Sequence, residues 1–351
     1  MAVDLLVGTR KGLFILASED RRKWVLKGPF LPGKEVNHAV QDQRNGRLLA
    51  TSNDAWFGSE LMWSDDQGRS WDSAKGINFR PEAGVNLERI WHIEPDLASS
   101  KTVYAGVAPA ALFRSEDGGS NWVEMRSLSE HSSKSEWTPG AGGMCLHSIV
   151  IDPDDSRNMW IGISAAGVFR SNDRGESWVP VNRGVRAESL PNKFPEVGQC
   201  VHKLLGDADV LFQQNHCGVY RSEDRGDNWK EITGSLPSDF GFPLALHPKD
   251  RNVLFVIPLE GADFRCPTGG NLVVFRSMDR GESWEAQRAG LPHPSYSKVL
   301  REGMTTDKAD PAGVYFGTDS GKVFATLNAG SEWYQVVDEL PPIYSLEAYA
   351  Y

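Results

Sequence analysis

The feature that most constrains this chain is an eight-residue pattern, S-x-D-x-G-x-x-W, that returns along its whole length. A clear copy is SNDRGESW at residues 171–178. Further copies lie at 64–71, 115–122, 222–229 and 277–284, with a worn copy, TLNAGSEW, at 326–333 and a shortened copy, SEDRRKW, at 18–24. The tryptophans stand at positions 24, 71, 122, 178, 229, 284 and 333, so the unit repeats roughly every 50 residues. Such a period indicates stacked supersecondary units, and seven of them fill the chain.

Each copy of the pattern, called a box from here on, separates two short apolar runs, which is typical of a β-hairpin. In the copy at 171–178 we expect the Asp173 carboxylate to accept hydrogen bonds from backbone N–H groups of its own turn. Gly175 allows a positive φ, and Trp178 can bury its ring under the turn. A carboxylate engaged in this way is a poor general acid, so the boxes are interpreted as structural and not catalytic.

The predicted fold is all-β: a seven-bladed β-propeller of four-stranded antiparallel blades, formed by residues 1–351 as a single domain. Residues 3–26 supply only three strands of a blade. The β-prone stretch IYSLEAYAY, residues 343–351, is predicted to pair with them as the missing innermost strand. This pairing would close the ring and remove two unpaired sheet edges.

The boxes resemble the Asp-box, or BNR repeat, of sialidases, sortilin-type receptors, xyloglucanase-type glycosidases and photosystem II stability/assembly factors. The strings VGTRKGLF, EVGQCVHK, FQQNHCGVYRS and DPAGVYFGT are similar to those of bacterial single-propeller proteins described as BNR-repeat or glycosyl-hydrolase-like. The resemblance implies the seven-bladed fold and a carbohydrate-derived ligand.

Composition narrows the class of partner. The net charge is −10 and no basic block occurs, which argues against nucleic acid. No apolar run reaches the roughly 18–20 residues that span a bilayer, so no membrane partner is expected. The first residues lack the order of a signal peptide, and the four cysteines (145, 200, 217 and 266) form no C-x-x-C pair. We therefore expect a reducing, cytoplasmic location.

The binding face is predicted from loop lengths. The four strands of a blade alternate in direction, so the boxes, which join the third strand to the fourth, lie on one face. The turns between the second and third strands and the connections from one blade to the next lie on the other face. Irregular insertions fall on that second face, at 72–88, 126–145, 182–200, 259–270 and 286–299. Loops of variable length on a regular scaffold are where binding sites are usually built, so a top-face axial pocket is expected there.

Candidate site residues follow from this placement. The catalytic candidates are His147, His202, His216, Glu196 and Glu302. The substrate-binding candidates are Arg10, Lys11, Asp54, Trp56, Arg89, Glu136, Gln214 and Asn215. The metal candidates are His147, His202, His216 and Gln199, because neutral imidazoles suit a divalent Mn, Fe or Zn ion. The alternative is that these histidines are hydrogen-bonded parts of the scaffold.

Three functions fit these residues. One is a metal-dependent lyase-like activity, since the three-His-plus-Gln set is similar to the manganese site of oligogalacturonate lyase. Another is glycoside hydrolysis, which needs two carboxylates about 5–10 Å apart across a sugar. The chain has no FRIP-type string, so a sialidase with the usual Arg triad is not expected; xyloglucanase-type enzymes join two propellers around a cleft. The third is a non-catalytic platform for a protein partner.

Overall fold

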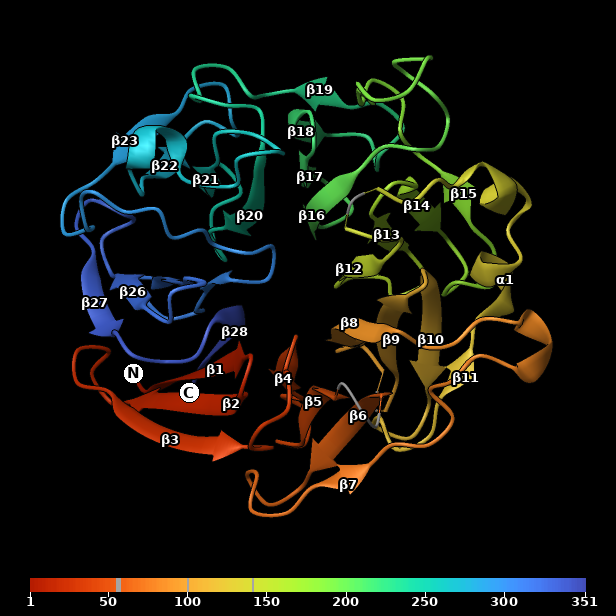
Figure 1. Cartoon of the computed structure of the whole chain (residues 1–351), viewed down its shortest axis with the longest axis horizontal. Coiled ribbons are helices and arrows are strands. Elements are labelled where there is room, and N and C mark those ends of the chain that lie inside the picture. Colours follow the sequence, from red (N-terminus) through yellow and green to blue (C-terminus); the bar gives the residue numbers. More distant parts are fainter. Residues whose placement is uncertain (55–57, 100, 141) are drawn as a thin grey trace. The chain divides into compact units, whose positions relative to one another are not determined.

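The computed structural model describes residues 1–54, 58–99, 101–140 and 142–351. Within these residues the strands form seven four-stranded antiparallel sheets (Figure 1), which confirms the predicted seven-bladed β-propeller class. The chain divides into two compact units. Unit 1 holds Met1–Ala39, Gln213–Arg221 and Glu231–Tyr351, and unit 2 holds Val40–Phe212 and Ser222–Lys230. The single domain expected for residues 1–351 stays a prediction.

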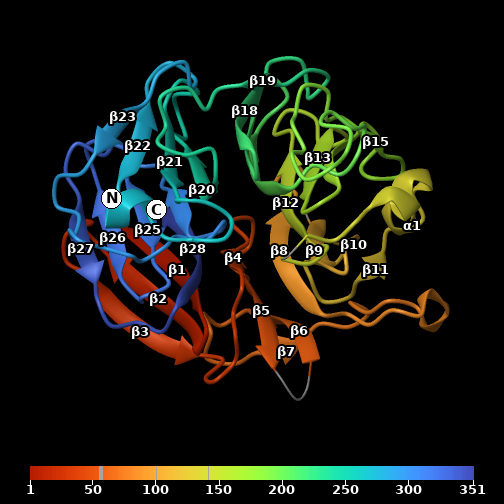
Figure 2. The same cartoon turned by 45° about the horizontal axis from the view of Figure 1, so that its top comes forward.

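One sheet of unit 1 joins the two ends of the sequence. Its strands, in spatial order, are β28 (Ile343–Ala350), β1 (Val3–Thr9), β2 (Gly12–Ser18) and β3 (Val25–Phe30). β28 runs antiparallel to β1, with Val3 opposite Ala350 and Leu6 opposite Glu347. Figure 2 shows β1, β2 and β3 side by side. The predicted pairing of the C-terminal strand is therefore confirmed.

Two further sheets belong to unit 1. The first contains β20 (Gly241–Leu246), β21 (Leu254–Pro258), β22 (Val274–Ser277) and β23 (Glu285–Gln287). The second contains β24 (Met304–Thr306), β25 (Val314–Gly317), β26 (Val323–Thr326) and β27 (Tyr334–Val337). Apolar side chains of successive sheets form shared cores, such as Phe255 with Phe316 and Leu5 with Tyr315.

Three sheets belong to unit 2, apart from Ala39 at the start of β4. The first contains β4 (Ala39–Gln41), β5 (Leu48–Asp54), β6 (Gly58–Ser64) and β7 (Asp72–Ser73). The second contains β8 (Arg89–Pro95), β9 (Val103–Ala108), β10 (Ala111–Ser115) and β11 (Val123–Glu124). The third contains β12 (Leu146–Ile151), β13 (Met159–Ile163), β14 (Gly167–Ser171) and β15 (Val179–Pro180). In these sheets too, apolar side chains of successive sheets form shared cores, such as Leu49 with Phe113 and Leu112 with Phe169.

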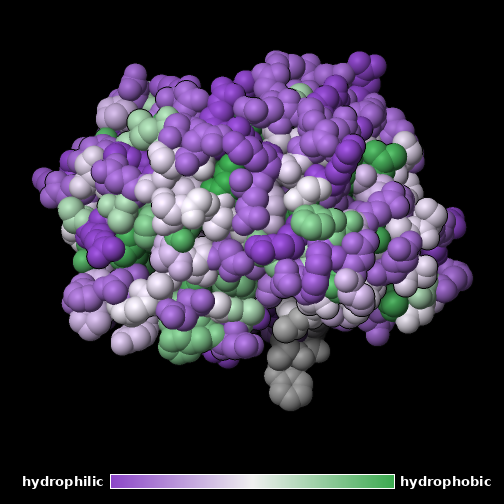
Figure 3. Space-filling model, turned by 90° about the horizontal axis from the view of Figure 1, so that it is seen from above, coloured by the Kyte–Doolittle hydropathy of each residue, from purple (hydrophilic) through white to green (hydrophobic). Residues whose placement is uncertain are grey.

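The remaining sheet contains β16 (Val201–Gly206), β17 (Leu211–Asn215), β18 (Gly218–Ser222) and β19 (Lys230–Glu231). Helices are short and lie in connections: α1 (Arg126–Ser129), η1 (Pro81–Ala83), η2 (Ser132–Glu136) and η3 (Thr268–Gly270). None of the helices in the described ranges is long and apolar enough to cross a membrane. The face drawn in Figure 3 is mostly hydrophilic, in line with the 24% of charged residues in the sequence.

The box at 171–178 has the predicted geometry. The Asp173 carboxylate accepts from the Ser177 backbone N–H at 2.9 Å, and Gly175 has a φ of +85°. Ser171 adds a contact that the pattern did not reveal, because its Oγ accepts from the Gly175 N–H at 2.8 Å. Burial alone would raise the pKa of Asp173, but the hydrogen bonds from Ser177 and Ser171 hold that pKa below its usual value. The predicted hydrogen bonds and glycine conformation of this box are confirmed.

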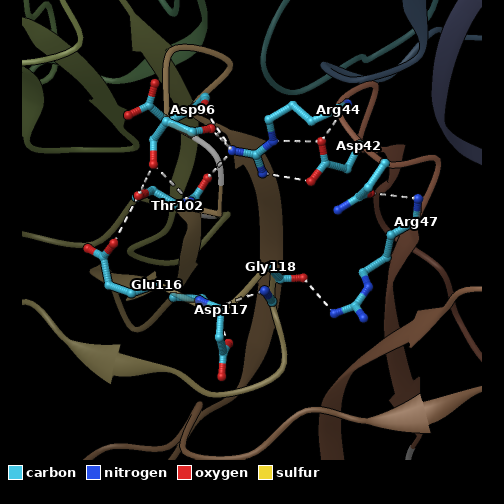
Figure 4. Close-up of polar contacts among 12 residues, drawn as sticks. Asp42, Arg44, Arg47, Asp96, Thr102, Glu116, Asp117 and Gly118 are labelled. Atoms are coloured by element: carbon cyan, nitrogen blue, oxygen red, sulfur yellow. Dashed lines mark hydrogen bonds and ion pairs between the residues drawn. The ribbon is translucent and has the colours of Figure 1, made fainter.

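An arginine in unit 2 ties two neighbouring sheets together (Figure 4). Arg44 follows β4 and binds Asp42 with two atoms, Nε to Oδ1 at 2.7 Å and an Nη to Oδ2 at 2.6 Å. Its other Nη donates to three backbone carbonyls between β8 and β9, those of Asp96, Ser99 and Thr102. The Asp42 side chain is fully buried, so this guanidinium neutralises a carboxylate that has no access to water.

Candidate functional site

In unit 2 the structure brings His147 together with the segment that carries His202. His147 lies on β12 and is fully buried. Its Nε2 is 2.9 Å from the Val201 carbonyl oxygen, and its Nδ1 is 3.0 Å from the Ser148 Oγ. That hydroxyl also accepts from the Leu204 N–H at 3.1 Å. Both ring nitrogens of His147 thus have hydrogen-bond neighbours within the scaffold, and its role as a metal ligand stays a prediction.

The segment before β16 holds two more of the predicted metal ligands. Gln199 is fully buried, and its Nε2 donates to the Pro195 carbonyl at 2.7 Å. Across the part of the chain that the structure covers, the Gln199 Oε1 meets no hydrogen-bond donor. His202 is buried on β16, whereas Glu196 is exposed. This segment therefore carries one buried amide oxygen that meets no donor and one buried imidazole.

His216 belongs to unit 1 and lies in the turn between β17 and β18. Its ring contacts the Phe240 ring edge-on, with the two centroids 5.1 Å apart. Burial lowers the pKa of His216, and the Asp239 charge opposes that shift. Gln214 donates to the carbonyls of Asn215 and Asp239 at 2.9 and 3.3 Å. Gln214 and Asn215 therefore shape this turn, and their contact with a substrate stays a prediction.

Arg10 and Lys11 are exposed at the turn between β1 and β2. The Arg10 Nε is 3.6 Å from the Glu35 Oε1, and the Arg10 side chain is 61% exposed. An exposed pair of this kind holds the guanidinium only weakly. Both cations are therefore accessible to a ligand.

The other binding candidates lie at scattered places in unit 2. Asp54 ends β5 and is half-buried, and Glu136 ends η2 and is exposed. Arg89 begins β8 and holds its guanidinium 5.5 Å from the centre of the Trp91 ring. Trp56 lies outside the described residues.

Glu302 is part of a cluster that the sequence revealed only in part. Its Oε2 lies 3.9 Å from the His38 Nε2, and the Glu347 Oε1 lies 3.3 Å from the same nitrogen. His38 and Glu302 are almost completely buried, whereas the Glu347 side chain is 28% exposed. We call His38, Glu302 and Glu347 the His38 cluster. The only feature of the sequence that could have drawn attention to Glu347 is that it is the single charged residue in the β-prone stretch IYSLEAYAY.

A cleft of about 270 Å³ lies elsewhere in unit 1, between the connection after β23 and the turn that joins β25 to β26. Tyr296 lines it and is 63% exposed. The rest of its lining combines apolar and polar groups: Leu272, Pro292, Pro294, Ser295, Ser297, Thr318, Ser320, Lys322 and Phe324. A second pocket of about 210 Å³ shares Leu272 and Pro292 with it. We call the first pocket the Tyr296 cleft.

The sequence did not single out Tyr296 or Lys322 as site residues. The signal available was the insertion at 286–299, which contains Tyr296 and was assigned to the binding face. Lys322 lies in a short turn, and nothing in the pattern marks that turn as unusual. The cleft therefore depends on the packing of two connections that the sequence alone does not place together.

Comparison with known proteins agrees with this architecture. The family model of the BNR-Asp box repeat matches residues 219–232. An oligoxyloglucan-reducing end-specific xyloglucanase of Emericella nidulans is 23% identical over 316 residues, which are 76% of this chain and 36% of that protein. The chain thus spans little more than a third of that relative's length.

Two solved structures share the fold. A GH74 enzyme of Niastella koreensis superposes with a TM-score of 0.67 at 16% identity, covering 94% of this chain and 52% of that one. YCF48 from Cyanidioschyzon merolae superposes with a TM-score of 0.52 at 13% identity, covering 92% of each chain. The chain is a BNR/Asp-box repeat propeller. Within that class it is distantly related to the GH74 xyloglucanases, and it shares its fold with YCF48.

Proposed function

We propose that this propeller binds a carbohydrate-derived ligand and that the Tyr296 cleft holds part of the sugar chain. The observation that carries the proposal is the exposed Tyr296 ring, set among hydroxyl groups in a cleft of unit 1. The distant relation to the xyloglucanases supports the same ligand class.

The lining of the cleft suits a sugar. The apolar C–H face of a pyranose can pack on an exposed aromatic ring, whose face carries partial negative charge. Sugar hydroxyls need donors and acceptors at the edge of the ring, which Ser295, Ser297 and Ser320 provide. Lys322 adds three donors on a flexible stem. A few polar groups placed around an apolar surface are typical of small-molecule sites.

The walls of the cleft are tied to each other before any ligand arrives. The Ser297 Oγ donates to the Ser320 Oγ at 2.8 Å. The Lys298 N–H donates to the Asp319 Oδ1 at 3.0 Å, and the Asp319 N–H donates back to the Lys298 carbonyl at 3.0 Å. Because these contacts fix the two connections, binding would cost little conformational entropy.

Titration calorimetry with xyloglucan oligosaccharides tests the proposal. We expect Tyr296→Ala to weaken binding about tenfold, which corresponds to about 1.4 kcal/mol for a stacked ring. Tyr351→Ala is the matched control, because Tyr351 is a comparably exposed tyrosine of unit 1 outside the cleft. Equal affinities of both variants and the wild type would place the sugar elsewhere. Absence of binding across xyloglucan, cellulose and pectin oligosaccharides would refute the carbohydrate proposal.

Cleavage of the bound sugar, glycosyl-hydrolase-like or metal-dependent lyase-like, is a second proposal. It assigns acid–base roles to Glu196 and Glu302 and places His147, His202 and His216 in an axial pocket. The observation behind the role of Glu302 is that this buried carboxylate lies in the His38 cluster, near His38 and a second carboxylate, Glu347. Release of reducing ends or of unsaturated products by the wild type but not by Glu302→Gln would support it. Capture of one stoichiometric protein partner without any sugar response would instead favour the platform alternative.

A divalent Mn, Fe or Zn ion at His147, His202, His216 and Gln199 stays a proposal, which metal analysis of His202→Ala would test. The cytoplasmic location expected from the sequence also stays a proposal. Fractionation of the producing cells is the direct measurement.

A further inference from the structure

The His38 cluster gathers three potential metal ligands from three separate segments of unit 1. His38 lies just before β4, Glu302 lies just before β24, and Glu347 lies in the middle of β28. Both carboxylates approach the same imidazole nitrogen, at 3.9 and 3.3 Å. Two carboxylates from segments far apart in sequence therefore lie near one imidazole nitrogen.

The backbone fixes two of these segments to the sheet of β1 and β28. The Leu346 N–H donates to the Glu302 carbonyl at 2.8 Å, which holds the Glu302 segment beside β28. The Val36 N–H donates to the Thr9 carbonyl at 2.9 Å, two residues before His38. Gly8 lets that segment approach, because a Cβ there would lie 2.4 Å from the Ser345 Oγ and 2.6 Å from the Val36 carbonyl oxygen.

The His38 Nε2 and the Glu347 Oε1 are within hydrogen-bond distance at 3.3 Å, and the same spacing also suits two ligands of a shared ion. Direct hydrogen bonds between a charged nitrogen and a carboxylate are about 2.7–2.9 Å long. Ligand atoms placed about 2.0–2.2 Å from a tetrahedral zinc ion are roughly 3.3–3.5 Å apart. The shorter of the two distances, 3.3 Å, falls at this second value, and the other, 3.9 Å, needs only a small movement of Glu302.

Burial differs among the three side chains, since His38 and Glu302 are almost completely buried. The partly exposed Glu347 gives an ion a way in from solvent.

We propose that the His38 cluster is a site for a divalent first-row cation, with the His38 Nε2, the Glu302 carboxylate and the Glu347 carboxylate as ligands. A mixed set of one nitrogen and two oxygen donors suits Zn²⁺ or Mn²⁺. The site is separate from the Tyr296 cleft and does not depend on sugar binding. Failure of the carbohydrate proposal would therefore leave it standing, and the reverse is equally true.

Elemental analysis tests the proposal on full-length protein that was purified without a metal-binding tag and dialysed against Zn²⁺ or Mn²⁺. We expect about one equivalent in the wild type and at least a tenfold loss in His38→Ala and in Glu347→Gln. The matched controls, His293→Ala and Glu339→Gln, change exposed residues of the same types in unit 1 and should keep the metal. Circular dichroism checks that each variant is folded. Glu347→Gln is the most informative variant, because the Glu347 side chain is partly exposed and its replacement should disturb folding least.

A second readout does not depend on variants. Protein stripped with a chelator and titrated with Co²⁺ should develop the visible absorption of a protein-bound ion, and added Zn²⁺ should remove it. Wild-type protein that retains no divalent ion and shows no such absorption would overturn the proposal. Metal that survives in folded His38→Ala and Glu347→Gln but is lost in His202→Ala would also overturn it, because the ion would then lie elsewhere.

Discussion

Replacing Arg44 with methionine tests whether one guanidinium holds two sheets of unit 2 together. The change removes both contacts to Asp42 and the bonds to the carbonyls of Asp96, Ser99 and Thr102, while it keeps most of the apolar stem. The Arg44 side chain is 13% exposed and that of Asp42 is fully buried.

The magnitude follows from the carboxylate that is left behind. Removing one partner of a buried ion pair costs about 3–5 kcal/mol, because the other charge stays buried without compensation. We therefore expect Arg44→Met to lower the free energy of unfolding by about that amount. Adding Asp42→Asn should recover part of the loss, because the uncompensated charge is then gone.

Urea unfolding followed by circular dichroism measures both effects, provided that the slope with urea is unchanged. The control is Arg157→Met. Asp155 and Arg157 form a pair with the same two-residue spacing and an equally short contact of 2.7 Å, but the two side chains are 36% and 69% exposed. That variant should unfold at the wild-type midpoint. If Arg44→Met cost no more than the control, or if the double variant were no more stable than Arg44→Met, the reasoning would be refuted.

Three further changes have definite expected outcomes. Gly8→Ala should destabilise the protein by about 1–3 kcal/mol in urea unfolding, since its Cβ would overlap Ser345 and Val36. The pKa of Asp66 is lowered to about 2, chiefly by hydrogen bonds from Ser70. The ionised Asp66 therefore stabilises the folded protein above its unfolded-state pKa of about 3.9, and this stabilisation is lost as the pH falls towards 2. In Asp66→Asn the urea midpoint should therefore change less with pH between about 4 and 2 than in the wild type. Burial lowers the pKa of Lys134 to about 8, so its acylation rate, followed by mass spectrometry, should level off above about pH 8, whereas that of exposed lysines should keep rising towards their ordinary pKa of about 10.4.

The boxes explain why the fold could be predicted from the sequence. Each box sets a turn by local hydrogen bonds, such as that from the Gly175 N–H to the Ser171 Oγ, so its pattern is visible without any tertiary information. Seven turns at a regular period fix the number of sheets and the place of most strands. The pairing of β28 with β1 could also be predicted, because residues 3–26 supply only three of the four strands that a blade needs.

Contacts between successive sheets could not be predicted from the sequence in the same way. The backbone N–H of Trp122 donates to the Lys75 carbonyl at 2.8 Å, and that of Trp333 donates to the Ala289 carbonyl at 2.8 Å. Each of these acceptor residues is followed by a glycine. This glycine is a second repeated feature of the sequence, but it is much less conspicuous than the boxes. These bonds depend on how successive sheets pack, which a single repeat does not specify.

The candidate site was predictable only in part, for the same reason. Glu302 was identified, but its neighbours His38 and Glu347 are 309 residues apart in the chain, and no local pattern relates them. Tyr296 lay within a recognised insertion, yet its exposure depends on the connection packing beside the turn at 318–322. Hydrogen bonds within a turn are encoded locally, whereas convergence of side chains is a property of the packed molecule.

The pairing of β28 with β1 also has a consequence during protein synthesis. A ribosome adds about 5–20 residues each second, so β28 emerges on the order of tens of seconds after β1. During that time the edge of β1 that β28 will cover is open to other strands. We expect chaperones that shield unpaired strands to increase the yield of this protein, and early release of the nascent chain to promote its aggregation.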